Sequence, residues 1–278
     1  MCVVLVKINK GDIKLYDTIT CGQIFRYSIL DNKYTIILSD RVVTLYEDDK
    51  YIYIDASNED DIENIIKDYL DLNRDYNEIC NKLVKNDKLI EGIVNECAGF
   101  KIIHSYPFET IISYMISANN NVKNIQKSVN LLSEKYGKKV HFNDCDYYLF
   151  PNLNDIKNLS IDDLNELKLG FRSTYIHDFL NKITIEDINN ISNMKTDDTL
   201  NYLMSFKGIG IKIASCILLF GYSRFDVYPI DTWVKKYMSD TYNISDTKKI
   251  EEFAKEKYNE YSGLVIQYMF HSKRNKLH

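Results

Sequence analysis

A lysine near the start of a helix and an aspartate further downstream are the residues of this chain best placed to do chemistry. Lys212 follows the short run Gly208-Ile209-Gly210, and Asp231 follows Pro229 and Ile230. A glycine hairpin that leads into a helix leaves backbone N–H groups free to bind a phosphate. The lysine adds a nucleophile and the aspartate a charge partner. A phosphate anchor beside a nucleophile is typical of an enzyme that acts on DNA.

Each of these features alone has an ordinary explanation. Lys212 by itself reads as a surface lysine, and Asp231 by itself predicts the N-cap of a helix that begins at Thr232. The glycine run does not fit the dinucleotide-binding fingerprint, because position 213 is isoleucine rather than glycine. Cys216 lies one helical turn after Lys212, so both side chains share one environment. The features together favour the functional interpretation.

The composition bounds the class of protein. The 278 residues, with 45% hydrophobic and 27% charged residues, are ordinary for a soluble globular protein with a buried core. The net charge of −5 weighs against an undifferentiated nucleic-acid binder but allows a local basic patch. No apolar run reaches the length of a membrane helix, so we expect no membrane association.

Cysteine usage and the N-terminus predict the compartment. The six cysteines are scattered without a C-x-x-C pair, which indicates reduced thiols. The first seven residues lack the features of a signal peptide. We therefore expect a cytoplasmic protein. Its abundance of Ile, Asn, Lys and Tyr is typical of an AT-rich genome, and we expect a bacterial or archaeal host.

The periodicity of apolar residues predicts the fold class. From about residue 3 to 54, short alternating runs at 34–38, 42–46 and 51–54 are separated by turn-forming residues, a pattern that predicts an antiparallel meander. After Ser57 the spacing becomes helical and stays so, with one helix opened by Pro107 and another ended by Gly137.

The predicted fold is α+β. It comprises an N-terminal antiparallel sheet domain with flanking helices, residues 1–100, and a helical core, residues 101–278. The core is expected to form two mainly helical subdomains and to contain a helix-hairpin-helix motif at about 198–221.

Five segments, in order along the chain, resemble the helix-hairpin-helix/Gly-Pro-Asp superfamily, and within it the 8-oxoguanine DNA glycosylase/lyase branch. They are residues 21–27, 117–121, 169–175, 203–238 and 263–270. The first contains Gly-Gln-x-Phe-Arg-aromatic, and the third contains Leu-Gly-aromatic-Arg. Iron–sulfur relatives are set aside because no cysteine follows Cys216, and monofunctional relatives because Lys212 is present.

The resemblance implies a bifunctional base-excision enzyme that acts on double-stranded DNA containing 8-oxoguanine. The damaged base is flipped into a pocket, Lys212 attacks the sugar C1′, and the resulting Schiff base permits β-elimination. A nearby carboxylate raises a lysine pKa, so Asp231 is expected to stabilise positive charge on the sugar rather than to activate the amine.

The resemblance also implies the residues that bind the base. A backbone carbonyl at Gly22 accepts the N7 hydrogen that 8-oxoguanine has and guanine lacks, and Cys216 and Phe270 sandwich the base. The family's base-reading glutamine aligns with Ile266 here, while Gln267 is adjacent. Gln267 is expected to take over this contact only if the helix is rotated.

Contacts to the rest of the DNA follow from the same resemblance. Phe171 is the expected wedge that fills the gap left by the flipped base. Asn119 and Arg172 are expected to hold the orphaned cytosine, and Gly208 and Gly210 to approach the DNA backbone. Asn124 stands where a second arginine is usual, which predicts a relaxed preference for the opposite base.

The expected reaction requires no cofactor and no iron–sulfur cluster. An alkali cation held by the carbonyls of Met204, Phe206 and Ile209 is a family feature, although Lys207 replaces the family's proline beside it. A monomer is expected. Two alternatives stay open: a glycosylase of the same superfamily for another oxidised or alkylated base, and a non-catalytic DNA-binding protein.

Overall fold

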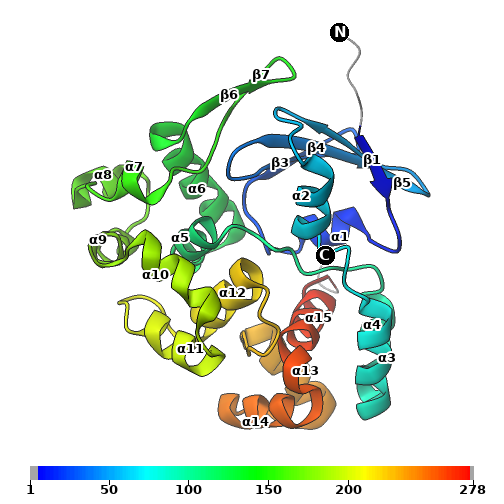
Figure 1. The fold of residues 1–278 in the computed structure, drawn as a ribbon. Helices are drawn as coiled ribbons and strands as arrows, with labels where there is room; N and C mark the ends of the chain where they lie inside the picture. Colours follow the sequence, from blue (N-terminus) through cyan, green and yellow to red (C-terminus); the bar gives the residue numbers. More distant parts are fainter. Residues whose placement is uncertain (1–5, 276–278) are drawn as a thin grey trace.

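The N-terminal part of the protein is a five-stranded antiparallel sheet. The computed structural model describes residues 6–275, so the first residues, on which the signal-peptide expectation depends, lie outside the described part. The strands lie side by side in the order β1-β5-β4-β3-β2 (Figure 1). They are β1 (Val6–Asn9), β2 (Tyr27–Leu30), β3 (Lys33–Ile37), β4 (Val42–Glu47) and β5 (Tyr51–Ala56).

The alternation in the sequence gives this sheet one apolar face. Ile36, Leu45 and Ile52 are fully buried and pack with residues of α1 (Leu15–Thr20) and α2 (Ile62–Tyr69). Asp31 and Asn32 both adopt positive φ in the turn between β2 and β3, as a two-residue hairpin requires. The predicted antiparallel meander is confirmed, with the runs 34–38, 42–46 and 51–54 forming β3, β4 and β5; β1, β2 and the helix α1 were not predicted individually.

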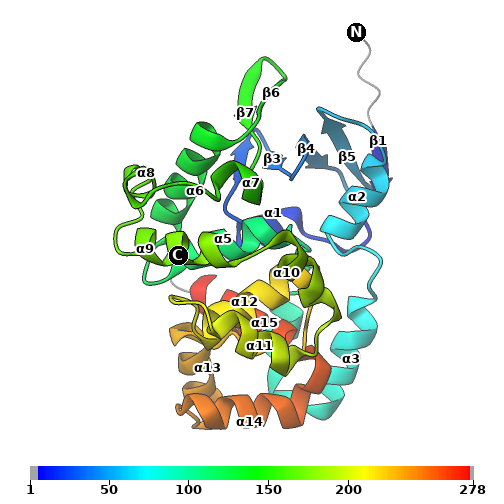
Figure 2. The same ribbon diagram turned by 60° about the vertical axis from the view of Figure 1, so that its left-hand side comes forward.

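The rest of the described chain is mainly helical and surrounds a second, larger core (Figure 2). The helices on one side are α5 (Pro107–Ser117), α6 (Val122–Tyr136), α7 (Leu153–Ile156), α8 (Ile161–Glu166), α9 (Arg172–Lys182), α10 (Ile185–Asn190), α11 (Thr196–Met204) and α12 (Ile211–Tyr222). The predicted helices at Pro107 and before Gly137 are therefore confirmed. The α+β fold class is confirmed as well.

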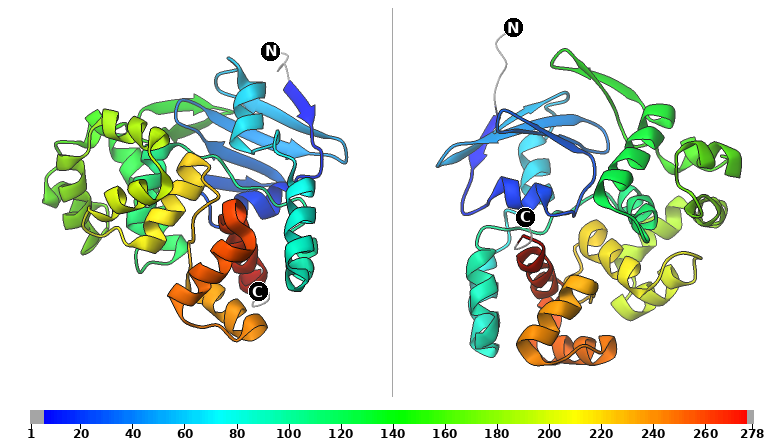
Figure 3. Two further views of the ribbon diagram at one scale, coloured as in Figure 1. Left: turned by 60° about the horizontal axis from the view of Figure 1, so that its bottom comes forward. Right: turned by 180° about the vertical axis from the view of Figure 1, so that it is seen from behind.

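The remaining helices form a second group, which lies below the sheet in Figure 1 and can be followed from behind in Figure 3. This group contains α3 (Tyr76–Asn86), α4 (Glu91–Glu96), α13 (Thr232–Tyr242), α14 (Thr247–Tyr258) and α15 (Ser262–Asn275). Helices α3 and α4 pack against α14 and α15 rather than on the sheet. The domain boundary at residue 100 stays a prediction.

One prediction was wrong: the chain does not stay helical after Ser57. A hairpin of β6 (Lys139–Phe142) and β7 (Cys145–Tyr148) follows α6. Its turn consists of Asn143 and Asp144, both with positive φ, and the Asn143 amide donates to Asp55 at the end of the main sheet. Strand β6 alternates but has only four residues, and β7 does not alternate, so the Asn-Asp turn was the clearest signal of the hairpin.

Candidate active site

The Gly208–Gly210 segment between α11 and α12 presents a short, open turn before the lysine. Gly208 has a φ of +91°, and a Cβ there would lie 2.5 Å from the Tyr175 ring, so only glycine fits. Gly210 is exposed, and a Cβ there would meet no atom within 4 Å. The turn therefore leaves the first N–H groups of α12 open to a phosphate.

Lys212 lies in the first turn of α12 and points into a small cavity. The cavity measures about 50 Å³ and is lined by segments that are far apart in the sequence. Its lining residues are Gly22, Tyr114, Lys212, Cys216, Phe220, Pro229, Asp231, Gln267 and Phe270. The lysine, the aspartate and most of the predicted base-binding residues thus meet at one place, which we call the lesion pocket.

Asp231 has a structural role as well as a place in the pocket. Its carboxylate accepts hydrogen bonds of 2.9 Å from the amides of Trp233 and Val234, which makes it the N-cap of α13 as predicted. Burial raises the pKa of Asp231, while these amides and the Lys212 charge oppose the shift. Among the residues that the structure describes, no ion pair joins Lys212 to Asp231.

Cys216 and Phe270 both line the lesion pocket, and they differ in burial and in chemistry. Cys216 is buried, and this burial raises the pKa of its thiol, opposed by the charge of Lys212. The thiol therefore offers a neutral, polarisable surface. Phe270 is half-buried, with the guanidinium of Arg274 at 5.8 Å from its ring centre.

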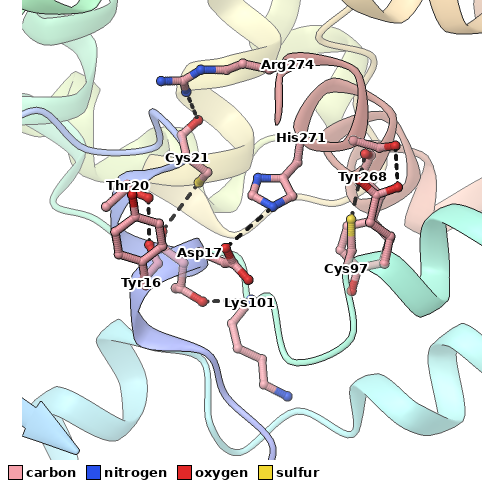
Figure 4. Close-up of polar contacts among 12 residues, drawn as sticks. Tyr16, Asp17, Thr20, Cys21, Cys97, Lys101, Tyr268, His271 and Arg274 are labelled. Atoms are coloured by element: carbon pink, nitrogen blue, oxygen red, sulfur yellow. Dashed lines mark hydrogen bonds and ion pairs between the residues drawn. The ribbon is translucent and has the colours of Figure 1, made fainter. Parts of the chain in front are cut away.

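The loop that carries Gly22 is fixed on both sides. Gln23 is buried, donates to the Lys101 carbonyl at 2.8 Å and accepts from the Ile103 amide at 2.9 Å. On the other side, Arg274 donates to the Cys21 carbonyl at 2.8 Å (Figure 4). Gly22 has a φ of +91°, so the direction of its peptide depends on glycine.

Helix α15 settles which neighbouring residue faces the lesion pocket. Gln267 lines the pocket together with Phe270, three residues later. Ile266 is 1% exposed, belongs to the apolar core and is not among the lining residues of the pocket, so a contact of Ile266 with the base stays a prediction that this position does not favour. The cause is helix rotation: a pair at i and i+3 faces the pocket, and the residue before Gln267 points toward the core.

A second cavity lies beside the residues expected to contact the opposite strand. It measures about 240 Å³ and is lined by Asn120, Asn124, Lys127, Ser128, Lys168, Gly170 and Arg172. We call it the opposite-strand cavity. Phe171, next to it in sequence, is 53% exposed, unusual for a large aromatic residue and suited to a wedge.

Arg172 is largely engaged by its own protein. Its guanidinium donates to the carbonyls of Ala118, Asn119 and Leu169 and uses four of its five N–H groups. These bonds hold the turn that contains Asn119, which is exposed with a φ of +50°.

Sequence reasoning missed three pocket residues and one supporting residue. Tyr114 and Phe220 lie in apolar helices, where their types indicate only a core position. Pro229 was noted as a marker before Asp231 rather than as a wall. Arg274 was visible only as part of a basic C-terminal stretch.

Comparison with known proteins places this site in a class. Residues 112–260 match the family model of HhH-GPD superfamily base excision DNA repair proteins, and residues 5–111 match that of the N-terminal domain of 8-oxoguanine DNA glycosylase. The fold and the site thus define a base-excision DNA glycosylase of the helix-hairpin-helix class.

Individual relatives narrow the assignment. The Clostridium acetobutylicum 8-oxoguanine glycosylase/lyase, solved with DNA containing cytosine opposite 8-oxoguanine, is 32% identical, with a TM-score of 0.91 over 98% of this chain and 99% of that one. The N-glycosylase/DNA lyase of Saccharomyces cerevisiae is 26% identical, covering 91% of this chain and 74% of the relative. The chain therefore belongs to the 8-oxoguanine DNA glycosylase family.

The fold alone extends beyond this family. The 3-methyladenine DNA glycosylase of Archaeoglobus fulgidus has a TM-score of 0.82 with 20% identity, covering 97% of this chain and 98% of that one. Separately, no helix in the described part of the chain is long and apolar enough to cross a membrane.

Proposed function

We propose that the protein excises 8-oxoguanine from duplex DNA and then cleaves the strand at the resulting site. The observation that carries the proposal is the lesion pocket itself. It brings Lys212 and Asp231 together with Gly22, Cys216 and Phe270, which come from distant parts of the chain. A nucleophile at the edge of a pocket for a flat ring suits attack on a flipped nucleotide.

The reaction uses the lysine amine in its neutral form. Its nitrogen bonds to the sugar C1′ while the glycosidic bond breaks, and the base leaves with that electron pair and takes up a proton. The alkylated amine then gives up a proton, and its lone pair breaks the bond from C1′ to the ring oxygen, which takes up a proton and leaves a protonated Schiff base. A C2′ proton departs to a base or to water, and the 3′ phosphate leaves with the electron pair of the bond from C3′ to oxygen. Water finally hydrolyses the imine and frees the lysine. Asp231 stabilises the positive charge that develops on the sugar.

Recognition of the base is assigned to four groups. The Gly22 carbonyl accepts the N7 hydrogen of 8-oxoguanine, Cys216 and Phe270 cover the two faces of the ring, and Gln267 binds its edge. The fixed loop around Gly22 supports this assignment, because a carbonyl discriminates between bases only if its direction is fixed.

The opposite strand is contacted by exposed residues. Phe171 fills the gap in the duplex, and Asn119 faces the orphaned base. Since four N–H groups of Arg172 are engaged, the arginine offers the orphaned cytosine at most one, and Asn124 provides no guanidinium. Both features support a relaxed preference for the opposite base.

Trapping with sodium borohydride tests the proposal. The protein is incubated with duplexes that carry 8-oxoguanine opposite each normal base, and the reduced Schiff base is detected as a covalent adduct. We expect an adduct with the parent and none with Lys212→Gln. A Lys212→Gln protein that releases base at the parental rate would show that another group is the nucleophile.

The similarity of fold to a 3-methyladenine enzyme favours one competing substrate class, alkylated bases. A panel of duplexes containing oxidised or alkylated bases distinguishes the two. Excision of alkylated bases without 8-oxoguanine would replace the proposed substrate. DNA binding with neither adduct nor alkali-sensitive sites would indicate a non-catalytic clamp.

We also propose an alkali-cation site at the carbonyls of the turn before α12. The Ile209 amide donates to the Phe206 carbonyl at 3.1 Å, which leaves this oxygen one lone pair. That lone pair is available to an alkali cation, which the carbonyls of Met204 and Ile209 would bind as well. Replacing potassium by a bulky organic cation and measuring DNA affinity tests this site.

We further propose a cytoplasmic monomer in a bacterial or archaeal cell, and sedimentation checks its oligomeric state.

A further inference from the structure

The opposite-strand cavity is lined by three cationic side chains, those of Lys127, Lys168 and Arg172, and its other lining residues are neutral. Within the described part of the chain, no ion pair includes any of these three cations. Burial lowers the pKa of Arg172, and no carboxylate opposes this shift. A protein with a net charge of −5 thus keeps one cavity positively charged.

Lys168 has a backbone conformation that lysine rarely adopts. It follows α8 with a φ of +60°, at the position where many helices end on glycine, and its amide donates to the Asn165 carbonyl at 3.1 Å. Every other non-glycine residue with positive φ in the described structure is Asn, Asp or Ser. A side chain in the left-handed region has a steric cost that glycine avoids. The lysine therefore weakens the fold at this position.

Helix α6 concentrates positive charge toward the same cavity. Lys127 is exposed and lies one turn after Lys123, and like charges four residues apart destabilise a helix. The first turn of α6 contains no acidic residue, although acidic side chains are favoured at that end of a helix. Local rules broken without compensation inside the protein are expected at functional sites. The missing compensation here is negative charge, so the cavity is suited to an anion.

Hydrogen-bond donors at the cavity wall fit an anion with several oxygens. Ser128 is 2% exposed and lines the cavity, so its hydroxyl is a neutral donor beside the lysines. Arg172 is 8% exposed, and four of its N–H groups donate to backbone carbonyls, which leaves one N–H at Nη1. The carbonyls hold this guanidinium in place, so its charge stays at the cavity wall.

We propose that the opposite-strand cavity binds a backbone phosphate of the DNA strand opposite the lesion, with Lys127 and Lys168 neutralising its charge and Ser128 donating to one of its oxygens. The inference rests on the proposed function, because the ligand belongs to the lesion duplex. A phosphodiester carries the negative charge that the cavity lacks, whereas the edge of a base is neutral. The strand is assigned from Asn124, which lines the same cavity.

A phosphate contact fixes the position of the duplex without reading its sequence. The two lysines should therefore raise the affinity for every duplex by the same factor, and they leave the choice of opposite base to other residues. The strain at Lys168 acquires a purpose in this way. The lysine lowers the stability of the free protein and contributes a cation to the complex with DNA.

The salt dependence of DNA binding measures this contribution. In a Lys212→Gln background, which prevents turnover, the Kd is measured at several potassium chloride concentrations for duplexes with 8-oxoguanine opposite cytosine or adenine. We expect Lys127→Gln and Lys168→Gly each to reduce the slope of log Kd against log salt by about 1. The ratio of the two Kd values should stay at the parental value. The Tm of Lys168→Gly should rise by about 2 °C, because glycine relieves the backbone strain.

Two variants outside the cavity are the matched controls. Lys255→Gln removes one positive charge from an exposed position on α14. Asn243→Gly places glycine at another exposed helix end with positive φ, after α13. Helix α14 and the end of α13 lie at the bottom of the molecule in Figures 1 and 2, away from α6 and α8. Both controls should keep the parental salt slope.

The outcomes separate this inference from the proposed function. If either cavity variant keeps the parental slope, or if Lys255→Gln reduces it equally, the inference is overturned. A change in the ratio between opposite bases would show that the lysines read a base rather than a phosphate, and a lower Tm of Lys168→Gly would show that the lysine serves the fold. Both results also overturn the inference. In all these cases lesion binding by the parent leaves the proposed function standing. A parent that does not bind the lesion duplexes overturns both.

Discussion

The lesion pocket and the opposite-strand cavity are built in contrasting ways. The first measures about 50 Å³ and is enclosed by aromatic rings, a thiol and a fixed backbone loop from distant segments. The second measures about 240 Å³ and is lined by polar side chains, with lysines at positions 127 and 168. The proposed site for the damaged base is thus built mainly from the folded core. The proposed site for its partner combines exposed side chains, such as those of Asn124 and Lys127, with the buried Arg172, which also holds the turn of Asn119.

The largest effect is expected for Asp231→Asn, which separates the catalytic role of Asp231 from its role as a helix cap. Asp231→Asn keeps an N-cap for α13, because asparagine caps helices as well as aspartate does. It removes the charge that stabilises the sugar cation, so we expect base excision to slow about 100-fold. Single-turnover rates measure this loss. A variant at the parental rate would restrict Asp231 to its capping role.

Asp231→Asn should also change how the stability of the protein depends on pH. The pKa of Asp231 is raised by burial, so the folded protein binds this proton more tightly than the unfolded chain. The contribution of Asp231 to stability therefore falls as pH rises through its pKa. The Tm of Asp231→Asn relative to the parent should increase from acidic to neutral pH. A constant difference would contradict the burial argument.

The next effect compares two glycines of one turn. Gly208→Ala forces an unfavourable φ and a collision with Tyr175, and should cost about 2 kcal/mol of unfolding free energy. Gly210→Ala meets no protein atom and should leave the Tm unchanged, while its methyl group weakens DNA binding. Denaturant titrations and DNA affinities measure both. Equal losses of stability would show that Gly210 also has a structural role.

The smallest effect concerns the opposite-strand cavity. Asn124 is exposed near the start of α6, so Asn124→Arg should fold normally and add a guanidinium beside the orphaned base. We expect preference for cytosine over the other opposite bases to rise about fivefold, or about 1 kcal/mol. Excision rates across the opposite bases measure it. A parent already confined to cytosine would remove the basis for this prediction.

The sequence was sufficient where the signal is local. Lys212, Asp231 and the glycine hairpin follow one another within a short stretch, and their spacing alone predicts α12, the N-cap of α13 and the glycine turn, while phosphate binding by this turn stays a prediction. Strands β3, β4 and β5 were predicted as well, because their residues alternate clearly between turn-forming residues, whereas β1, β2 and the helix α1 were not predicted individually. Roles in DNA binding came from resemblance and stay predictions.

Sequence reasoning could not predict the features that depend on contacts between segments far apart in the chain. The choice between Ile266 and Gln267 depends on the rotation of α15, which is set by packing against α4 and α13. Tyr114 looks like any core aromatic until its hydroxyl is seen against Gly22. The β6–β7 hairpin was missed because its strands are short and its turn was not considered.

The bond between Arg274 and the Cys21 carbonyl joins residues 253 positions apart in the chain. Helix α15 also packs against α13, the helix that Asp231 caps, and its residues 264–266 are almost fully buried in the apolar core. One helix therefore supports the Gly22 loop, the position of Asp231 and the side chains of Gln267 and Phe270. A substitution that loosens α15 should lower stability and disturb several walls of the lesion pocket at once.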